Sequence, residues 1–508
     1  YITEQPKLPT AEIGFAIGAP VLELQEGTRT ITVTISLANP IETAILDITN
    51  NFSIYATGAE GWMGPLSVSN LSNGKNKNLP KTTSNLQFTL VLDGEQDAIV
   101  PYSKELHEGT FSDAVPMLKF ELNIAQPSHA NGYLLYTQLL ENKIKDITVS
   151  VAVTDASSLV LSNDIGGIKA DKPFYPFGTQ PVEKNSLYVD YPEAFSKNWD
   201  TVTIQGDWLN QPEDFVQHYI AYRKKGGNKN LSPNQYYQVL YFQDHQTATG
   251  TNPNGTFAPT TVASNLYVSS NDHFKASIAV KKNGEFEQQH SSLSLFKKNG
   301  ASFANGFTLQ NASKDLEGPI EISLLQSFLH RVYPKVLALS MGSEQDTILP
   351  NEPYTPMAEN LRLSYTASEK RTFNNKSQQA NDGTITLHHL HPFGHAVNNQ
   401  TLEPTYCSGG ALYIGLSGTK KLQQVQLLVQ LLEGTENPEV YSFSSNDKIT
   451  WSYLSDNKWI SFSRDYFRGD TTDNFLQTGI VSFIVPPEAT QNNTLLPSGL
   501  VWIKATNP

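Results

Sequence analysis

Histidines gather in one short stretch in the last third of the chain, at residues 388, 389, 391 and 395. On an extended segment, side chains two residues apart point to the same face, so His389 and His391 lie close enough to share a metal ion, and His395 is a third candidate ligand. Clustered histidines alone fix neither the geometry of a site nor a fourth ligand. We therefore favour structural histidines and predict no metal and no cofactor, with a zinc-like site as the alternative.

Catalytic signatures are absent from the sequence. There is no glycine-rich phosphate loop ending in Lys-Ser/Thr, no Gly-x-Ser-x-Gly turn and no His-Glu-x-x-His pair. The single cysteine, Cys407, excludes a disulfide framework and matches no reactive-cysteine signature, so we interpret it as a small buried or loop residue. Glu213, Asp214 and Asp470 are candidate carboxylates for glycoside hydrolysis, but nothing distinguishes them from surface acids. The sequence predicts a protein that is not an enzyme, with a polysaccharide-active enzyme as an alternative.

Aromatic residues raise a different possibility, because exposed Trp and Tyr side chains stack on sugar rings. Trp451, Tyr453 and Trp459 are the candidates. Large aromatic side chains are more often buried, so we favour residues that fill a sandwich core and its corners. A secreted carbohydrate-binding or adhesin-like β protein stays open as the alternative function.

The composition indicates a folded, β-rich protein that does not bind nucleic acid. Of 508 residues, 39% are hydrophobic and only 17% are charged, which is short of the Glu and Lys that long surface helices display. The 33 Gly and 29 Pro are typical of many short strands and turns. The net charge of -13 repels phosphate, and the basic stretch at residues 223–229 is interrupted by glycines, as in a solvated loop. No run approaches the ~20 apolar residues of a membrane span.

Strands must therefore position most of these residues. In the clearest case, Ile31, Val33, Ile35 and Leu37 alternate with threonine and serine, which predicts a half-buried strand. Similar strand-like stretches lie at residues 86–92, 117–124, 147–153, 202–208, 274–280 and 361–365.

Helical patterns are rarer. Residues 324–329 favour a short helix, and residues 212–219 begin with the Pro and acidic residues that suit a first helical turn. The fold class is therefore mainly β with minor α, in several β-sandwich-like modules.

An internal repeat suggests that one module is used twice. The first copy contains Pro173, Phe174, Pro176, Phe177 and Gly178, and the second contains Pro392, Phe393 and Gly394. In each copy Pro and Gly fix a bend, Phe buries it, and an aliphatic-Tyr-aliphatic strand and then an apolar strand follow.

The repeat and the polar stretches at residues 226–234, 246–259 and 371–383, which predict long loops, suggest four modules. These are a β-rich N-terminal part at residues 1–165, the first repeat module at 166–300, a connecting part with a short helix at 301–383, and the second repeat module at 384–508. Because the chain begins at Tyr1 with no charged-then-apolar leader, we expect an interior portion of a longer chain.

Several stretches resemble one protein family. Residues 159–167, followed by the bend at 172–181, are similar to a segment of the baseplate J-like wedge proteins of extracellular contractile injection systems, the antifeeding-prophage type of phage-tail-like particle. Residues 349–356, 470–483 and 496–503 resemble the same family in the same order.

This resemblance implies a structural wedge subunit that links the central hub and spike to the sheath and transmits the contraction trigger. It implies other wedge subunits, hub, spike and sheath proteins as partners in a six-fold hetero-oligomer. It also implies assembly in the cytoplasm, followed by a place in an extracellular particle.

Overall fold

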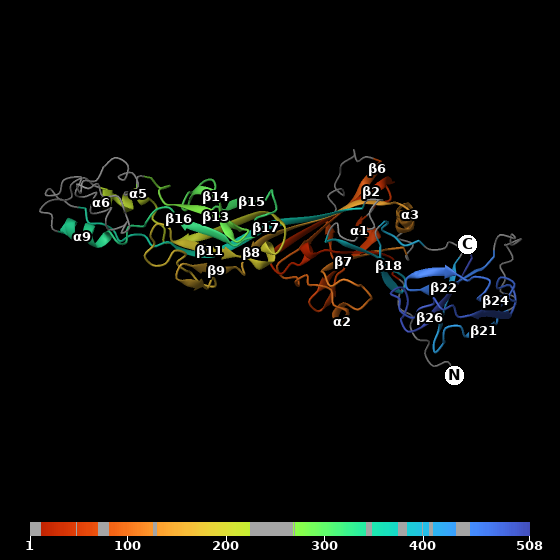
Figure 1. Ribbon diagram of the computed structural model, residues 1–508. Helices are drawn as coiled ribbons and strands as arrows, with labels where there is room; N and C mark the ends of the chain where they lie inside the picture. Colours follow the sequence, from red (N-terminus) through yellow and green to blue (C-terminus); the bar gives the residue numbers. More distant parts are fainter. Residues whose placement is uncertain are drawn as a thin grey trace, which may run out of the picture.

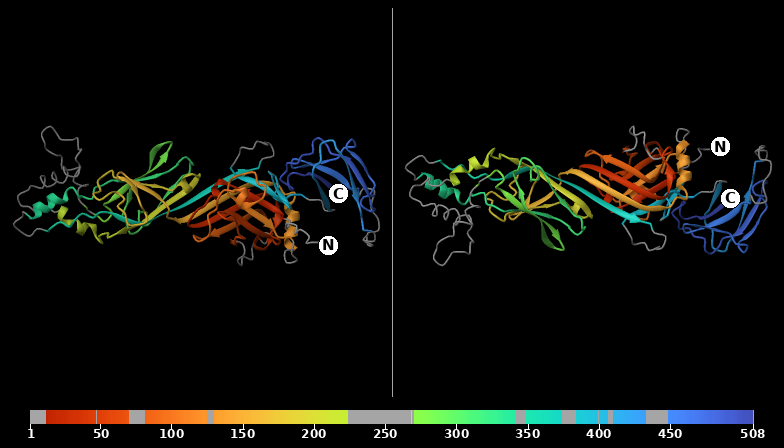
Figure 2. Two further views of the ribbon diagram at one scale, coloured as in Figure 1. Left: turned by 90° about the horizontal axis from the view of Figure 1, so that it is seen from below. Right: turned by 90° about the horizontal axis from the view of Figure 1, so that it is seen from above.

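The computed structural model describes residues 12–46, 48–69, 81–124, 130–223, 268, 270–341, 348–373, 384–398, 400–405, 410–432 and 448–507. The fold is mainly β with minor α, as the sequence predicts, and its strands form several antiparallel sheets. The molecule is long and narrow, with a body of two parts in line and a separate C-terminal sandwich at one end (Figures 1 and 2).

One seven-stranded sheet extends through both parts of the body. The alternating residues Ile31, Val33, Ile35 and Leu37 are buried on one of its central strands, which confirms the predicted half-buried strand. In spatial order its strands are β15 (Phe307–Gln310), β12 (Trp199–Leu209), β17 (Met357–Thr372), β8 (Ile144–Ala156), β2 (Thr28–Glu42), β6 (Thr82–Leu92) and β5 (Val68–Ser69).

Two six-stranded sheets complete the body. The first has the order β19 (Gly394–Val397), β18 (Thr386–His391), β1 (Gly14–Gly18), β7 (Met117–Leu122), β3 (Phe52–Gly58) and β4 (Gly61–Met63). The second has the order β10 (Gly166–Ile168), β9 (Val160–Asn163), β11 (Ser186–Asp190), β16 (Ile320–Leu324), β13 (Lys275–Lys282) and β14 (Glu285–Ser294). One continuous apolar core joins them to the long sheet; for example, Phe88 of β6 contacts Phe52 and Phe120 of the first.

The C-terminal sandwich has its own core. Its four-stranded sheet has the order β20 (Ala411–Leu416), β26 (Val501–Thr506), β22 (Thr450–Ser455) and β23 (Lys458–Ser461). Its three-stranded sheet has the order β21 (Gln424–Val429), β25 (Gly479–Ile484) and β24 (Phe467–Asp470). Trp451 and Tyr453 are buried between the sheets, as the aromatic pattern predicts.

Short helices lie between the strands along the chain. They are the 3-10 helix η1 (Pro20–Leu22) and α1 (Ile48–Asn51), α2 (Lys104–His107), α3 (Ala130–Leu139), α4 (Pro192–Phe195), α5 (Phe215–His218), α6 (Ile220–Arg223) and α9 (Tyr333–Met341). Among the described residues, no helix is long and apolar enough to cross a membrane.

Of the two helices that the sequence predicts, the structure contains one. The helix expected at residues 212–219 is confirmed as α5, where the Asp214 carboxylate accepts the backbone N–H of Val216 at 2.8 Å. The helix expected at 324–329 is wrong. Leu324 ends β16, and the N–H of Leu325 donates to the carbonyl of Lys275 at 2.9 Å. Pairing with neighbouring segments therefore outweighs the local helical preference.

The four-module division stays a prediction, although strand pairing crosses its borders. β17 lies between β12 and β8, so strands from three of the expected modules share one sheet. Cys407, the basic residues 224–229, the loops at 226–234 and 246–259, and residues 374–383 lie outside the described residues.

Candidate functional site: the joint between body and C-terminal sandwich

The histidine-rich segment forms the contact between the body and the C-terminal sandwich. β18 and β19 make a hairpin with Pro392 and Phe393 at its turn, and β18 pairs with β1 of the body. The N–H of His395 donates to the carbonyl of Thr494 in the sandwich at 2.8 Å. We call the β18–β19 hairpin together with residues 494–496 the joint.

Close backbone approach defines the joint. A Cβ atom on Gly394 would overlap the carbonyl of Thr494, so only glycine allows this contact. From the body, the Thr110 hydroxyl donates to the same carbonyl at 2.9 Å. Ala396 packs against Leu495 and Leu496 of the sandwich. The joint therefore combines backbone hydrogen bonds with a small apolar contact.

Each of three histidines has a structural partner. His388 Nε2 lies 2.7 Å from the Asp113 carboxylate, and His389 Nε2 lies 2.9 Å from the carbonyl of Thr401. His395 stacks on Phe111 with ring centroids 4.0 Å apart. These contacts agree with the preferred interpretation of structural histidines.

The expected histidine pair lies as the sequence predicts. His389 and His391 have ring centroids 6.0 Å apart. Among the described residues, no three His, Cys, Asp or Glu side chains are grouped to hold a metal ion. The metal alternative therefore gains no support from this part of the chain.

Burial keeps these imidazoles neutral at ordinary pH. It lowers the pKa of His389 and of His391 to about 4, and that of His395 to about 3. It also lowers the pKa of His388, against the opposing effect of Asp113. Neutral rings suit a packed contact, because a buried charge is costly unless it is paired.

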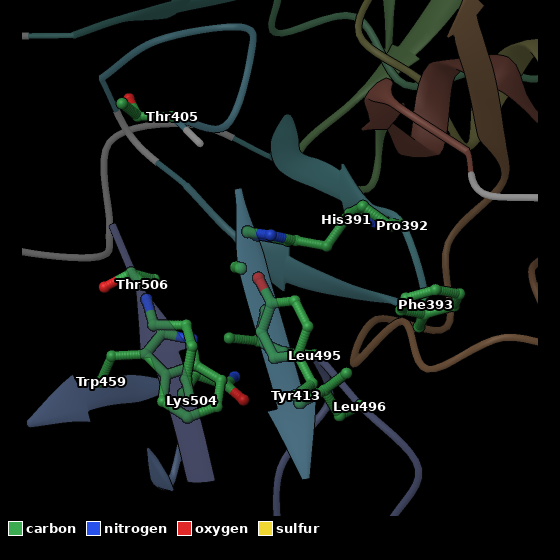
Figure 3. Close-up of a pocket in the computed structure, with 12 residues that line it drawn as sticks. His391, Pro392, Phe393, Thr405, Tyr413, Trp459, Leu495, Leu496, Lys504 and Thr506 are labelled. Atoms are coloured by element: carbon green, nitrogen blue, oxygen red, sulfur yellow. The ribbon is translucent and has the colours of Figure 1, made fainter. Parts of the chain in front are cut away.

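A cavity of about 520 Å³ lies beside the joint (Figure 3). His391 projects from the hairpin toward the strand that carries Tyr413. The ammonium group of Lys504 lies over the Trp459 ring, 4.8 Å from its centroid, and that ring packs at 5.7 Å from Tyr413. The lysine thus covers one face of the indole.

Trp451 is too buried to stack on a sugar ring, so it is no longer a candidate for carbohydrate binding. Its side chain is 6% exposed, and its indole N–H donates to Asp470 at 3.1 Å. With one face of Trp459 covered as well, the aromatic residues give the carbohydrate-binding alternative little support.

The two copies of the repeated bend have different surroundings. In the first copy Phe174 and Phe177 are buried, Gly178 has a φ of 79°, and the Phe174 N–H donates to the carbonyl of Ala358 at the start of β17, at 2.9 Å. In the second copy Phe393 is 43% exposed at a hairpin turn. The expected burial of the motif's Phe is therefore correct for the first copy and wrong for the second, and duplication of a module stays a prediction.

The candidate catalytic carboxylates do not meet. Asp214 caps α5 at one end of the molecule, whereas Asp470 lies on β24 in the sandwich at the other end (Figure 1). Asp470 accepts the Trp451 N–H and, at 2.7 Å, the Thr472 hydroxyl. Both carboxylates have structural roles, and Glu213 is exposed.

A comparison with protein-family models decides the family. Residues 6–270 and 320–507, most of the chain, match the family described as "Baseplate protein PVC11-like". The chain belongs to the PVC11-like baseplate family. A comparison with curated proteins finds no match. The chain is thus a baseplate protein of a contractile injection system, part of an extracellular phage-tail-like particle and assembled with its other components.

Membership of the PVC11-like family changes which sites matter. A baseplate protein serves its particle by structure, which favours a non-enzymatic role. The sites of interest are then surfaces that contact neighbours and contacts that keep the long body rigid.

Sequence reasoning missed one such contact in the body, a buried polar cluster around Glu193. The carboxylate accepts the Tyr365 hydroxyl at 2.5 Å, the Tyr191 hydroxyl at 3.1 Å and the Gln25 N–H at 2.8 Å. Lys197 Nζ lies 3.6 Å away and donates to Tyr365 at 2.8 Å.

The cluster around Glu193 ties the N-terminal segment and α4 to β17. Burial lowers the pKa of Lys197 to about 8 and, with the nearby Glu193 carboxylate, raises that of Tyr365. No local pattern in the sequence indicates it, because its members lie far apart along the chain.

Proposed function

We propose that this PVC11-like protein is a wedge subunit that links the central hub and spike of the baseplate to the sheath. The observation that carries the proposal is the family match over both parts of the body and the C-terminal sandwich. The resemblance of residues 159–181 and 470–503 to baseplate J-like wedge proteins supports the same role.

The long shape supports a linking role. β17 has 16 residues, which at about 3.3 Å per residue span about 50 Å. It pairs with β12 through residues 357–367 and with β8 through residues 363–372. In Figure 2 these strands run from one part of the body into the other. A pull along the strands loads many ladder hydrogen bonds together, so the two parts move as one.

Rigidity also supports transmission of a trigger. A signal that shifts one end of a stiff body displaces the other end, and a packed core switches between discrete arrangements rather than deforming continuously. Wedge subunits of this kind assemble with hub, spike and sheath proteins in a six-fold hetero-oligomer. Assembly takes place in the cytoplasm before the particle is released.

Omission of the chain from particle production tests the proposal. We expect hub and spike complexes without attached sheath, together with free or unassembled sheath protein, in electron micrographs. Complementation with the full chain should restore sheathed particles. Sheathed particles of normal appearance without the chain would contradict the linking role.

A further inference from the structure

The C-terminal sandwich is open along one side. β20 is one edge strand of the four-stranded sheet and β21 is one edge strand of the three-stranded sheet, and the chain passes directly from β20 to β21. No residue from 411 to 432 is fully buried, whereas β25 and β26, the strands they pair with, bury their inward residues. The core is therefore incompletely covered on the side of β20 and β21.

Apolar residues line this open side. Leu412 pairs with the buried Ala505 but is itself 46% exposed. On the outer face, Leu428 is 70% exposed and pairs with Ile480, which is 44% exposed. The inward row that remains only partly covered consists of Ile414, Leu416, Val425, Leu427 and Val429.

The backbone of β21 also has a free edge. The N–H of Ile484 donates to Tyr466 beside β24, and ladder bonds alternate in direction along an antiparallel strand. Odd-numbered residues of β25 therefore bond to β21, through residues 425, 427 and 429. The N–H and C=O groups of Gln424, Gln426 and Leu428 consequently face outward, and no strand in the described residues pairs with them.

This edge lacks the usual protection against pairing. Edge strands commonly carry Lys, Pro or a bulge, but β21 reads Gln-Val-Gln-Leu-Leu-Val and pairs with β25 in continuous register. Exposed Lys420 and Lys421 stand just before it, in a chain of net charge -13. The edge therefore combines free backbone groups, apolar side chains and a local positive charge.

We propose that β21 binds an extended segment of another baseplate subunit, which adds to the sheet as a further strand. This inference rests on the proposed function. A strand satisfies both the outward N–H and C=O groups and the apolar row, whereas a helix would leave the backbone groups unpaired. The segment alternates apolar residues with polar ones, and it carries an acidic residue where it passes Lys420 and Lys421.

Proline at position 426 tests the proposal. Gln426→Pro removes one outward N–H group but no hydrogen bond to β25. Edge strands tolerate proline at such a position. Gln426→Ala retains the N–H and is the matched control. Tagged full-length variants are expressed with the other particle genes, and their amounts in purified particles are measured. We expect the alanine variant to match wild type and the proline variant to drop at least tenfold, with both isolated proteins keeping the wild-type circular dichroism.

A charge reversal at two exposed lysines provides a second variant. Reversal of Lys420 and Lys421 to Glu leaves the backbone unchanged, so folding is not at risk. We expect several-fold less of this variant in particles. Wild-type amounts of both the proline and the charge-reversed variants would overturn the inference.

Hydrogen exchange distinguishes which segment pairs with the free edge of β21. In dilute isolated protein, the amides of Gln424, Gln426 and Leu428 should exchange rapidly. In particles they should slow at least about tenfold, which corresponds to about 1.4 kcal/mol of protection. Protection already present in dilute protein would assign the edge to the chain itself, and protection that grows with its concentration would assign it to a second copy; both overturn the inference. Absence of wild type from particles would instead refute the proposed function.

Discussion

A buried carboxyl group allows a quantitative test of the packing beside the joint. Glu403 lies just after the joint hairpin, between Leu402 of the main core and Pro404, whose carbonyl accepts the Tyr136 hydroxyl. Its side chain is fully buried, and among the described residues neither carboxyl oxygen has a hydrogen-bond partner. Burial raises the pKa of Glu403 from 4.5 to about 8.

The sign of the effect follows from proton linkage. Because the folded pKa lies above the unfolded one, the contribution of Glu403 to stability is fully present below pH 4.5 and is lost as pH rises toward 8. At pH 7, which is about 2.5 pH units above the unfolded pKa, the lost stability is about 2.5 × 1.4 kcal/mol, or roughly 3.5 kcal/mol. Gln has a similar shape and no charge, so Glu403→Gln should stabilise the folded protein by about 2–4 kcal/mol at pH 7.5 and by little at pH 5.

Urea unfolding at pH 5 and pH 7.5 measures this difference. The comparison of variant with wild type isolates Glu403 from other titrating groups, and Glu213→Gln, which changes an exposed acid, is the control. The reasoning is refuted if Glu403→Gln and wild type respond equally to pH over this range.

Three further outcomes are expected. Glu193→Ala leaves the Lys197 ammonium buried without its carboxylate, so the free energy of unfolding from urea titration should fall by about 3 kcal/mol or more, and a loss below about 1 kcal/mol would count against the cluster. Gly394→Ala should separate the sandwich from the body and broaden the small-angle scattering distance distribution, whereas Gly469→Ala, where a Cβ meets no atom, should not. As pH falls from 6.5 to 4, His395 takes up a proton in the unfolded chain but not in the folded protein, where burial lowers its pKa to about 3, so the free energy of unfolding should fall. His395→Phe should reduce this fall in stability, as measured in thermal melts at both pH values. An equal fall in wild type and variant would contradict this account.

The sequence predicts elements well where local pattern and burial agree. Ile31 to Leu37 alternate because one face of β2 packs on the core, and Asp214 begins α5 because its carboxylate reaches two free backbone N–H groups. The helix expected near Leu325 fails because the strand pairing of β16 with β13 continues there through the carbonyl of Lys275.

The candidate site was only partly predictable. The spacing of His389 and His391 correctly predicts neighbouring rings, but the contact of the hairpin with Thr494 depends on a loop about one hundred residues later. The Glu193 cluster likewise joins residues that only the tertiary fold brings together. Pairing and burial over such separations leave no local pattern.

Cross-linking of purified, uncontracted particles followed by mass spectrometry tests the linking role most directly. Lys335 belongs to α9 and Lys458 to β23 of the C-terminal sandwich. In Figure 1, α9 and this sandwich lie at opposite ends of the long molecule. The account predicts cross-links from one of these lysines to a hub or spike protein and from the other to a sheath-proximal protein. Cross-links from both lysines to the same single partner would contradict it.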